Sequence, residues 1–69
     1  MTEIALTVNG EPRRVPATTT LAEVVATVSR SNTGVAAALN EAVVPRGSWP
    51  ETELNTGDRI EILTAVQGG

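Results

Sequence analysis

Alternating apolar and polar positions open the sequence, and this period of two predicts a β-strand with one buried face. The strand is predicted over residues 3–8. Its buried face would carry the side chains of Ile4, Leu6 and Val8. The dipeptide Asn9-Gly10 follows directly. It predicts a two-residue hairpin turn, because both central residues of a type I′ turn have positive φ.

A returning strand is predicted over residues 11–15. Pro12 lies inside it and Pro16 directly after it, and proline has no N–H to donate to a neighbouring strand. We therefore expect this strand at an edge of the sheet. The adjacent pair Arg13-Arg14 is interpreted as the solvated end of the strand, since short charge runs are weak indications of a binding site.

Helical periodicity replaces the alternation after Thr20. Thr20 and Glu23 have the spacing of a capping box, in which each side chain binds a backbone N–H at the start of a helix. Four apolar residues then recur on one helical face: Leu21, Val24, Val25 and Val28. The helix is predicted to end within residues 29–34, where Asn32 or Gly34 would suit a left-handed cap.

The second half of the sequence is less regular. Residues 35–39 are short, apolar and bounded by turn residues, so a strand is predicted, although three alanines could equally favour a helix. Residues 43–45 predict a brief strand that a proline stops. Residues 46–55 are expected to form an irregular connection with room for one short turn. Within it Trp49 would cover one end of the core and Leu54 would anchor the loop.

A turn over residues 55–58 leads into the last strand, which alternates from Arg59 onward. This order of elements predicts an α+β domain, with one helix on one face of a mixed sheet of four or five strands. We expect the last strand to lie beside the first, parallel to it, in the middle of the sheet. The folded domain would span residues 1–66, and residues 67–69 would form a flexible tail.

Composition excludes several functional classes. Sixty-nine residues predict one domain with little room for an internal active site. The chain has no Cys and no His, so the usual thiol nucleophiles, imidazole bases and zinc sites are excluded, and no metal site is predicted. A net charge of −3 and a single aromatic residue argue against nucleic acid. Without a secretory signal or a bilayer-spanning run, we expect a cytoplasmic protein with no membrane partner.

The last two residues are glycines, Gly68 and Gly69. One interpretation is a frayed chain end, because chain ends are often poorly ordered. The other is that the terminal carboxylate of Gly69 is itself the functional group. Glycine has no Cβ, so such an end can pass through a channel that is too narrow for other residues.

Several segments, taken in order, carry a more specific indication: V-N-G-E at 8–11, T-L-A-E at 20–23, V-A-A-A-L-N-E at 35–41, V-V-P-R at 43–46, Trp49, and G-D-R-I-E-I-L-T-A-V at 57–66 before the glycines. Together they resemble the ThiS family, the sulfur carriers of thiamine thiazole biosynthesis, over nearly the whole chain. The resemblance implies a ubiquitin-like β-grasp fold. It also implies a carrier protein that acts as a cosubstrate and is not an enzyme.

The resemblance further implies chemistry at Gly69. An E1-like adenylyltransferase of the ThiF or MoeB type would use ATP and magnesium to adenylate the Gly69 carboxylate. A sulfur donor, such as a cysteine desulfurase relay, would convert it to a thiocarboxylate, which would donate sulfur to a thiazole synthase of the ThiG type. The chain itself would bind no cofactor. Its residues agree in one respect: without cysteine it cannot carry sulfur as a persulfide, so the terminal acyl group is the covalent site that remains.

Partner contacts are expected along the last strand and the tail. Five residues are expected to make them: Leu63, Ala65, Val66, Gln67 and Gly68. Gly68 would keep the tail slender, and the residues before it would present extended backbone for strand addition. Glu61, Leu63 and Ala65 would face away from the helix, beside Ala5 and one of the alanines at 36–38. This predicts a shallow docking patch around Leu63, although a lone exposed or buried leucine is the alternative.

Three other functions stay open. The first is the small subunit of molybdopterin synthase, which has the same fold, the same Gly-Gly end and similar chemistry. That protein carries sulfur for the molybdenum cofactor. A ubiquitin-like modifier would be attached to other proteins; the absence of lysine excludes only chains built on its own side chains. Finally, the chain could be an interaction domain whose tail has no chemistry.

Overall fold

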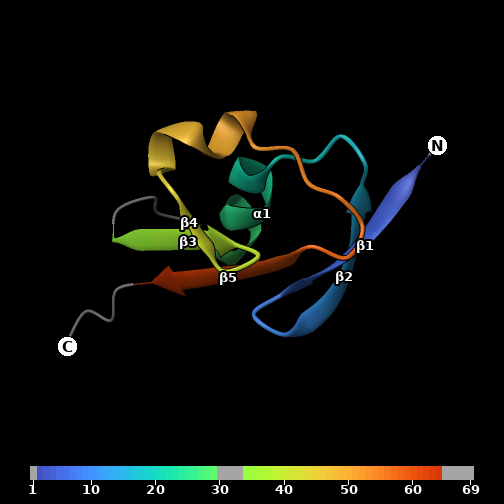
Figure 1. Cartoon of the computed structure of the whole chain (residues 1–69), viewed down its shortest axis with the longest axis horizontal. Coiled ribbons are helices and arrows are strands. Elements are labelled where there is room, and N and C mark those ends of the chain that lie inside the picture. The colour runs from blue at the N-terminus through green and yellow to red at the C-terminus, as the bar shows by residue number, and fades with distance from the viewer. Residues whose placement is uncertain (1, 30–33, 65–69) are drawn as a thin grey trace.

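The computed structural model describes residues 2–29 and 34–64. In chain order the elements are β1 (Glu3–Val8), β2 (Glu11–Pro16), α1 (Leu21–Val28), β3 (Val35–Leu39), β4 (Ala42–Val44), the 3-10 helix η1 (Arg46–Glu51) and β5 (Arg59–Thr64). The five strands form one sheet in the order β2-β1-β5-β3-β4 (Figure 1). The predicted α+β architecture with a mixed sheet is therefore confirmed, and the sheet has five strands.

Strand β5 lies in the centre of the sheet. It is parallel to β1 and antiparallel to β3 (Figure 1). The pairing with β3 is the longer of the two and runs from Val35 opposite Thr64 to Leu39 opposite Ile60. The predicted place of the last strand is thus confirmed, and neighbouring backbone supports it on both sides.

The core lies between the sheet and the two helices. Within the described part of the chain, eleven buried side chains form it: Ile4, Leu6, Val8, Leu21, Val24, Val25, Ala37, Trp49, Leu54, Ile60 and Ile62. Leu21 of α1 and Ile60 of β5 are fully buried. Burial of a large aliphatic side chain contributes about 1.5–3 kcal/mol, whereas an exposed ion pair contributes about 0–1 kcal/mol. Apolar packing, not surface charge, therefore holds the helix on the sheet.

Helix α1 begins as its sequence predicts. The backbone N–H of Thr20 donates to Glu23 Oε1 at 2.9 Å, and the N–H of Glu23 donates to Thr20 Oγ1 at 3.4 Å. The prediction of a left-handed cap at the C-terminal end of α1 is wrong. Ser29, in an extended conformation, ends the helix and donates its N–H to Val25 O. Gly34 does have a positive φ of 71°, but it lies just before β3, and Asn32 is outside the described residues.

The edge position of β2 is confirmed, and its prolines have a specific orientation. A two-residue turn makes Val8 and Glu11 a hydrogen-bonded pair, and such pairs alternate along an antiparallel ladder. Pro12 and Pro16 therefore occupy positions whose nitrogen points away from β1. An exposed edge strand is a template for unwanted pairing. Proline occupies two of the three outward positions of β2 and removes the donors there, whereas Arg14 keeps its N–H at the third.

The segment after β3 is more regular than expected. Strand β4 covers Ala42–Val44, not residues 43–45, because a two-residue turn at Asn40 and Glu41 joins it to β3. The connection expected to be irregular contains η1, a six-residue 3-10 helix. Trp49 of η1 is buried, as expected, and its indole N–H donates to Val44 O at 2.8 Å. This bond ties η1 to the end of β4.

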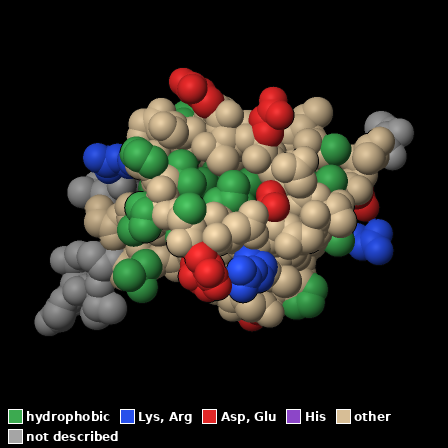
Figure 2. Space-filling model, viewed as in Figure 1, with side chains coloured by type: hydrophobic (Ala, Val, Ile, Leu, Met, Phe, Trp, Pro, Cys, Tyr) green, Lys and Arg blue, Asp and Glu red, His purple; other side chains and the backbone are tan. Residues whose placement is uncertain are grey.

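Charged and apolar side chains share the surface. Figure 2 shows one cluster of hydrophobic side chains to the left of centre, with acidic side chains above, below and to the right of it. Among the residues described, no helix has the length and hydropathy needed to cross a membrane.

Two asparagines in hairpin turns bind β5 from opposite sides. Asn9 lies in the β1–β2 turn with a φ of 53°, and Asn40 lies in the β3–β4 turn with a φ of 52°. Asparagine tolerates this left-handed conformation better than most residues. The N–H of Ile62 donates to Asn9 Oδ1 at 2.8 Å, and the N–H of Arg59 donates to Asn40 Oδ1 at 2.9 Å. Both turns therefore contribute a side-chain acceptor to the central strand.

The Asn9 side chain extends the parallel ladder beyond the end of β1. Its own N–H donates to Ile60 O at 2.8 Å, as in a regular parallel pair. In such a pair its main-chain carbonyl would accept from the N–H of Ile62. The chain turns at this point, and Asn9 Oδ1 accepts that N–H instead. The pairing of β5 therefore continues past the last residue of β1.

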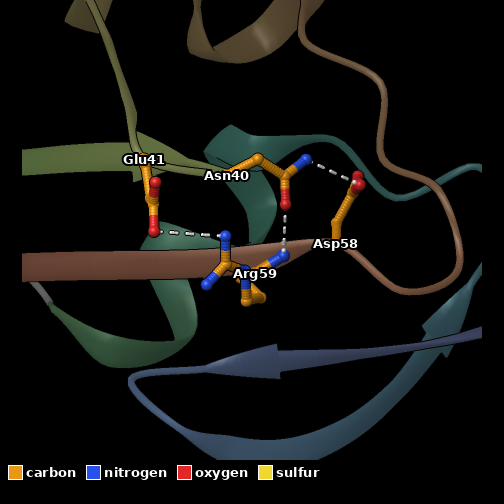
Figure 3. A network of polar contacts seen from close by, with 4 residues as sticks. All are labelled: Asn40, Glu41, Asp58 and Arg59. Carbon is orange, nitrogen blue, oxygen red and sulfur yellow. Dashed lines mark hydrogen bonds and ion pairs between the residues drawn. The ribbon is translucent and has the colours of Figure 1, made fainter.

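Asn40 connects its hairpin to the turn that precedes β5 (Figure 3). Its Nδ2 donates to Asp58 Oδ1 at 3.0 Å, and Asp58 Oδ2 accepts from the N–H of Asn55 at 2.7 Å. Arg59 Nη2 lies 3.3 Å from Glu41 Oε2 in the same hairpin. The first residue of β5 is thus held through both its backbone and its side chain.

Replacement of Asn9 by glycine should lower the free energy of unfolding by about 1 kcal/mol, because the hydrogen bond is lost while the positive φ stays accessible. Asn9→Asp is the matched control, since it keeps an oxygen acceptor and also tolerates this φ. Urea denaturation measures the stability, and amide hydrogen exchange at Ile62 should become faster in Asn9→Gly only. Equal stability and exchange in the two variants would contradict the role of Asn9 Oδ1.

Candidate functional site

The predicted reactive end lies outside the described residues. This applies to Gly69, the expected site of chemistry, and to Gly68, Gln67, Val66 and Ala65, the expected partner contacts. The division into a domain of residues 1–66 and a tail of residues 67–69 stays a prediction for the same reason. The structure does describe the strand that leads to this segment, up to Thr64 at the end of β5.

The side chains of β5 point alternately to the two faces of the sheet. Ile60 and Ile62 are buried against the helix side, with 0% and 7% of their surface exposed. Arg59, Glu61 and Leu63 are exposed, so they occupy the opposite face. This face, which carries no helix, is called the open face below. Leu63 therefore points away from the core, as expected.

Apolar side chains surround Leu63 on the open face. Ala36 lies directly opposite Leu63 on β3, and Ala38 lies opposite Val43 on β4. Leu63 is 74% exposed and Val43 is 78% exposed. We call these four residues, Ala36, Ala38, Val43 and Leu63, the open-face patch. The exposure of Leu63 and Val43 is unusual in a domain that buries most of its described large apolar side chains, and exposed apolar clusters often mark interaction sites.

A shallow hollow of about 500 Å³ coincides with this patch. Its lining consists of Asn9, Ala36, Ala37, Ala38, Val43, Glu61, Ile62 and Leu63. On the open face, the short side chains of Ala36 and Ala38 on β3 lie between the larger ones of Leu63 on β5 and Val43 on β4. The hollow is therefore suited to receive a side chain from another protein. A docking role for Leu63 itself stays a prediction.

Val43 is a patch residue that sequence reasoning missed. Its place depends on the register of the β3–β4 hairpin, in which Asn40 and Glu41 have φ values of 52° and 73°. A positive φ at both positions normally favours Asn-Gly or Asp-Gly, so Asn-Glu is a weak signal for this turn. Ala5, which was expected beside Leu63, is exposed on β1 but lines a different hollow together with Arg14.

The charged residues of the open face are partly paired. Arg59 contacts Glu41 at 3.3 Å, and Arg14 lies 3.9 Å from Glu3. The carboxylate of Glu61 makes no hydrogen bond or ion pair with any other described residue, although the backbone of Glu61 is paired with β3. Among the residues that the structure describes, the open face thus combines an apolar hollow with the carboxylate of Glu61, which has no ion-pair partner within that part of the chain.

The described residues contain no cluster of side chains that could hold a metal ion. Within residues 2–29 and 34–64, no three Asp or Glu side chains come close enough to hold an ion.

A solved structure of a known protein matches this fold over almost the full length of the chain. The crystal structure of the thiamine biosynthesis protein ThiS from Geobacter metallireducens is similar, with a TM-score of 0.74 and 29% identity. The match covers 96% of this chain and 100% of that one. The fold expected from the resemblance, a ubiquitin-like β-grasp, is thereby confirmed.

A longer relative shares the same segment. The thiazole synthase of Paramagnetospirillum magneticum (strain ATCC 700264 / AMB-1) is 31% identical over 64 residues. These residues are 93% of this chain but only 20% of that protein, so the chain spans about a fifth of the length of this relative. The sequence model of the ThiS family matches residues 6–69, which include both final glycines. This protein belongs to the ThiS family.

Proposed function

We propose that this protein is a sulfur carrier that supplies sulfur for the thiazole ring of thiamine. The observation that carries the proposal is the ThiS family match, which extends from the first strand through Gly69. The structural likeness to a thiamine biosynthesis protein supports the same pathway. In this proposal the protein is a cosubstrate that partner enzymes modify and consume, and it is not itself an enzyme.

The proposed chemistry takes place at the Gly69 carboxylate. A free carboxylate is a poor electrophile because its negative charge is delocalised over two oxygens. An E1-like adenylating enzyme would join this carboxylate to the α-phosphate of ATP and release pyrophosphate. A sulfur nucleophile would then attack the acyl carbon and displace AMP, a good leaving group. Where that nucleophile is the terminal sulfur of a partner's persulfide, the attack gives an acyl disulfide. A thiol of a partner would then attack the partner's sulfur, form a disulfide with it and release the thiocarboxylate, in which sulfur replaces one carboxylate oxygen.

The remaining groups would come from partners. The chain has no cysteine or histidine, so the sulfur nucleophile, the nucleotide site and the magnesium site are assigned to the adenylating enzyme and the sulfur donor. Thiazole synthase is the proposed sulfur acceptor. The relative that bears that name contains a segment 31% identical to this chain, which supports a functional link between the two proteins.

The open-face patch is the proposed docking surface for the adenylating enzyme. Leu63 lies on the strand that leads to Gly69, six residues before it. Six extended residues span about 20 Å, so one enzyme can contact the patch and still reach the terminal carboxylate with its catalytic groups. Burial of Leu63 and Val43, which are largely exposed in the free protein, would contribute apolar contact area.

Replacement of Leu63 by aspartate should weaken binding to the adenylating enzyme by about tenfold or more, because a charge would enter the apolar centre of the contact. Val43→Asp should act in the same direction. Calorimetric titration of each variant with the purified enzyme measures the effect. Ala26→Asp is the control, since Ala26 is exposed on α1 and lies away from the open face. Unchanged affinity in both patch variants, with folding confirmed by circular dichroism, would exclude the patch as the docking surface.

Deletion of Gly69 should abolish the function without affecting the fold, because the terminal carboxylate would move by one residue from the position that the partner enzymes recognise. A strain in which this is the only carrier should then require added thiamine for growth. A strain expressing the Ala26→Asp variant should not require it. Growth of the deletion strain without thiamine would argue against the proposed role.

A further inference from the structure

Glu61 is the acidic residue of the open face that lies inside the hollow of the open-face patch. Glu61 lies on β5 between Arg59 and Leu63, is exposed, and stands directly opposite Ala38 on β3. Of the described residues that line the hollow of the open-face patch, Glu61 alone has a charged side chain. Its position is therefore within the proposed contact and not on the periphery of the molecule.

The cationic side chain next to Glu61 on the same face of β5 already has a partner. Arg59 is two residues before Glu61 on the same face of β5, within reach of a long side chain. The guanidinium of Arg59 instead lies 3.3 Å from Glu41, in the β3–β4 turn (Figure 3). The same turn holds the backbone of Arg59 through Asn40. Glu61 consequently has no ion pair with another described residue.

The surroundings of Glu61 leave its carboxylate dependent on water. Its cross-strand neighbour Ala38 has no polar side-chain atom, and Leu63, the next residue on the same face, is apolar. In the free protein the solvent compensates for this. A partner that covers the hollow removes that water, and a buried carboxylate without a partner carries a large desolvation penalty.

We propose that Glu61 determines which enzyme can dock on the open face, by requiring a lysine or arginine side chain opposite it. The occupant is the adenylating enzyme of the proposed function, on which this inference rests. Its surface would place an apolar side chain between Val43 and Leu63 and a cationic side chain against the Glu61 carboxylate. The apolar contact provides area, whereas the ion pair selects the partner and fixes its orientation.

Charge reversal tests this inference. Glu61→Lys should weaken binding of the adenylating enzyme by about tenfold or more at low salt, because two cations would face each other in the contact. Glu61→Gln should have a smaller effect, since it removes the attraction without adding repulsion. Glu51→Lys is the matched control: it makes the same change of charge at an exposed position on η1, away from the open face. Its affinity should stay within about twofold of the wild type.

Rescue identifies the counterion directly. Each exposed lysine and arginine of the enzyme is changed to glutamate in turn. One of these enzyme variants should restore binding of Glu61→Lys and weaken binding of the wild-type carrier.

Two outcomes would overturn the inference. One is a Glu61→Lys variant that binds the enzyme with wild-type affinity. The other is an equal loss of affinity in Glu61→Lys and Glu51→Lys, which would indicate only a long-range effect of net charge. If the enzyme modifies the wild type and Glu61→Lys equally well, this inference alone fails. If it neither binds nor modifies the wild type, the proposed function fails with it.

Discussion

The structure depends on the pairing of β5 on both of its sides. The strand lies between β1 and β3, and its backbone receives two additional side-chain acceptors, from Asn9 and Asn40. Ile60 and Ile62 then anchor one face of the strand in the core. Because successive side chains of a strand alternate between faces, this anchoring places the intervening side chains on the open face. The same strand therefore forms the centre of the fold and presents the candidate docking surface.

The regular parts of the fold could be predicted because each has a local signal. The alternation around Leu6, the turn at Asn9-Gly10 and the capping box at Thr20 each determine an element from a few neighbouring residues. The open-face patch could be predicted only in part. Leu63 follows from the period of β5, but Val43 joins the patch through the register of a hairpin whose turn sequence is unusual. The side-chain bonds of the asparagines also depend on strands distant in sequence, which no local pattern reveals.

Membership of the ThiS family gives this geometry a biochemical meaning. In the proposed account the protein contributes three things to a reaction that others catalyse: a rigid central strand, a surface beside it, and a terminal carboxylate. The apolar patch supplies binding area and Glu61 supplies selectivity, so that recognition is separated from the chemistry at Gly69. A carrier that serves two enzymes in turn requires such a separation, because both must reach the same carboxylate and neither can hold it permanently.

The intact mass of the protein, after incubation with the adenylating enzyme, ATP, magnesium and a sulfur donor, tests the central claim most directly. The account predicts a gain equal to the replacement of one oxygen by sulfur, located at Gly69 by fragmentation. The gain should disappear when ATP is omitted, because the carboxylate would not be activated. An unchanged mass, with an enzyme that is demonstrably active on another carrier, would contradict the account.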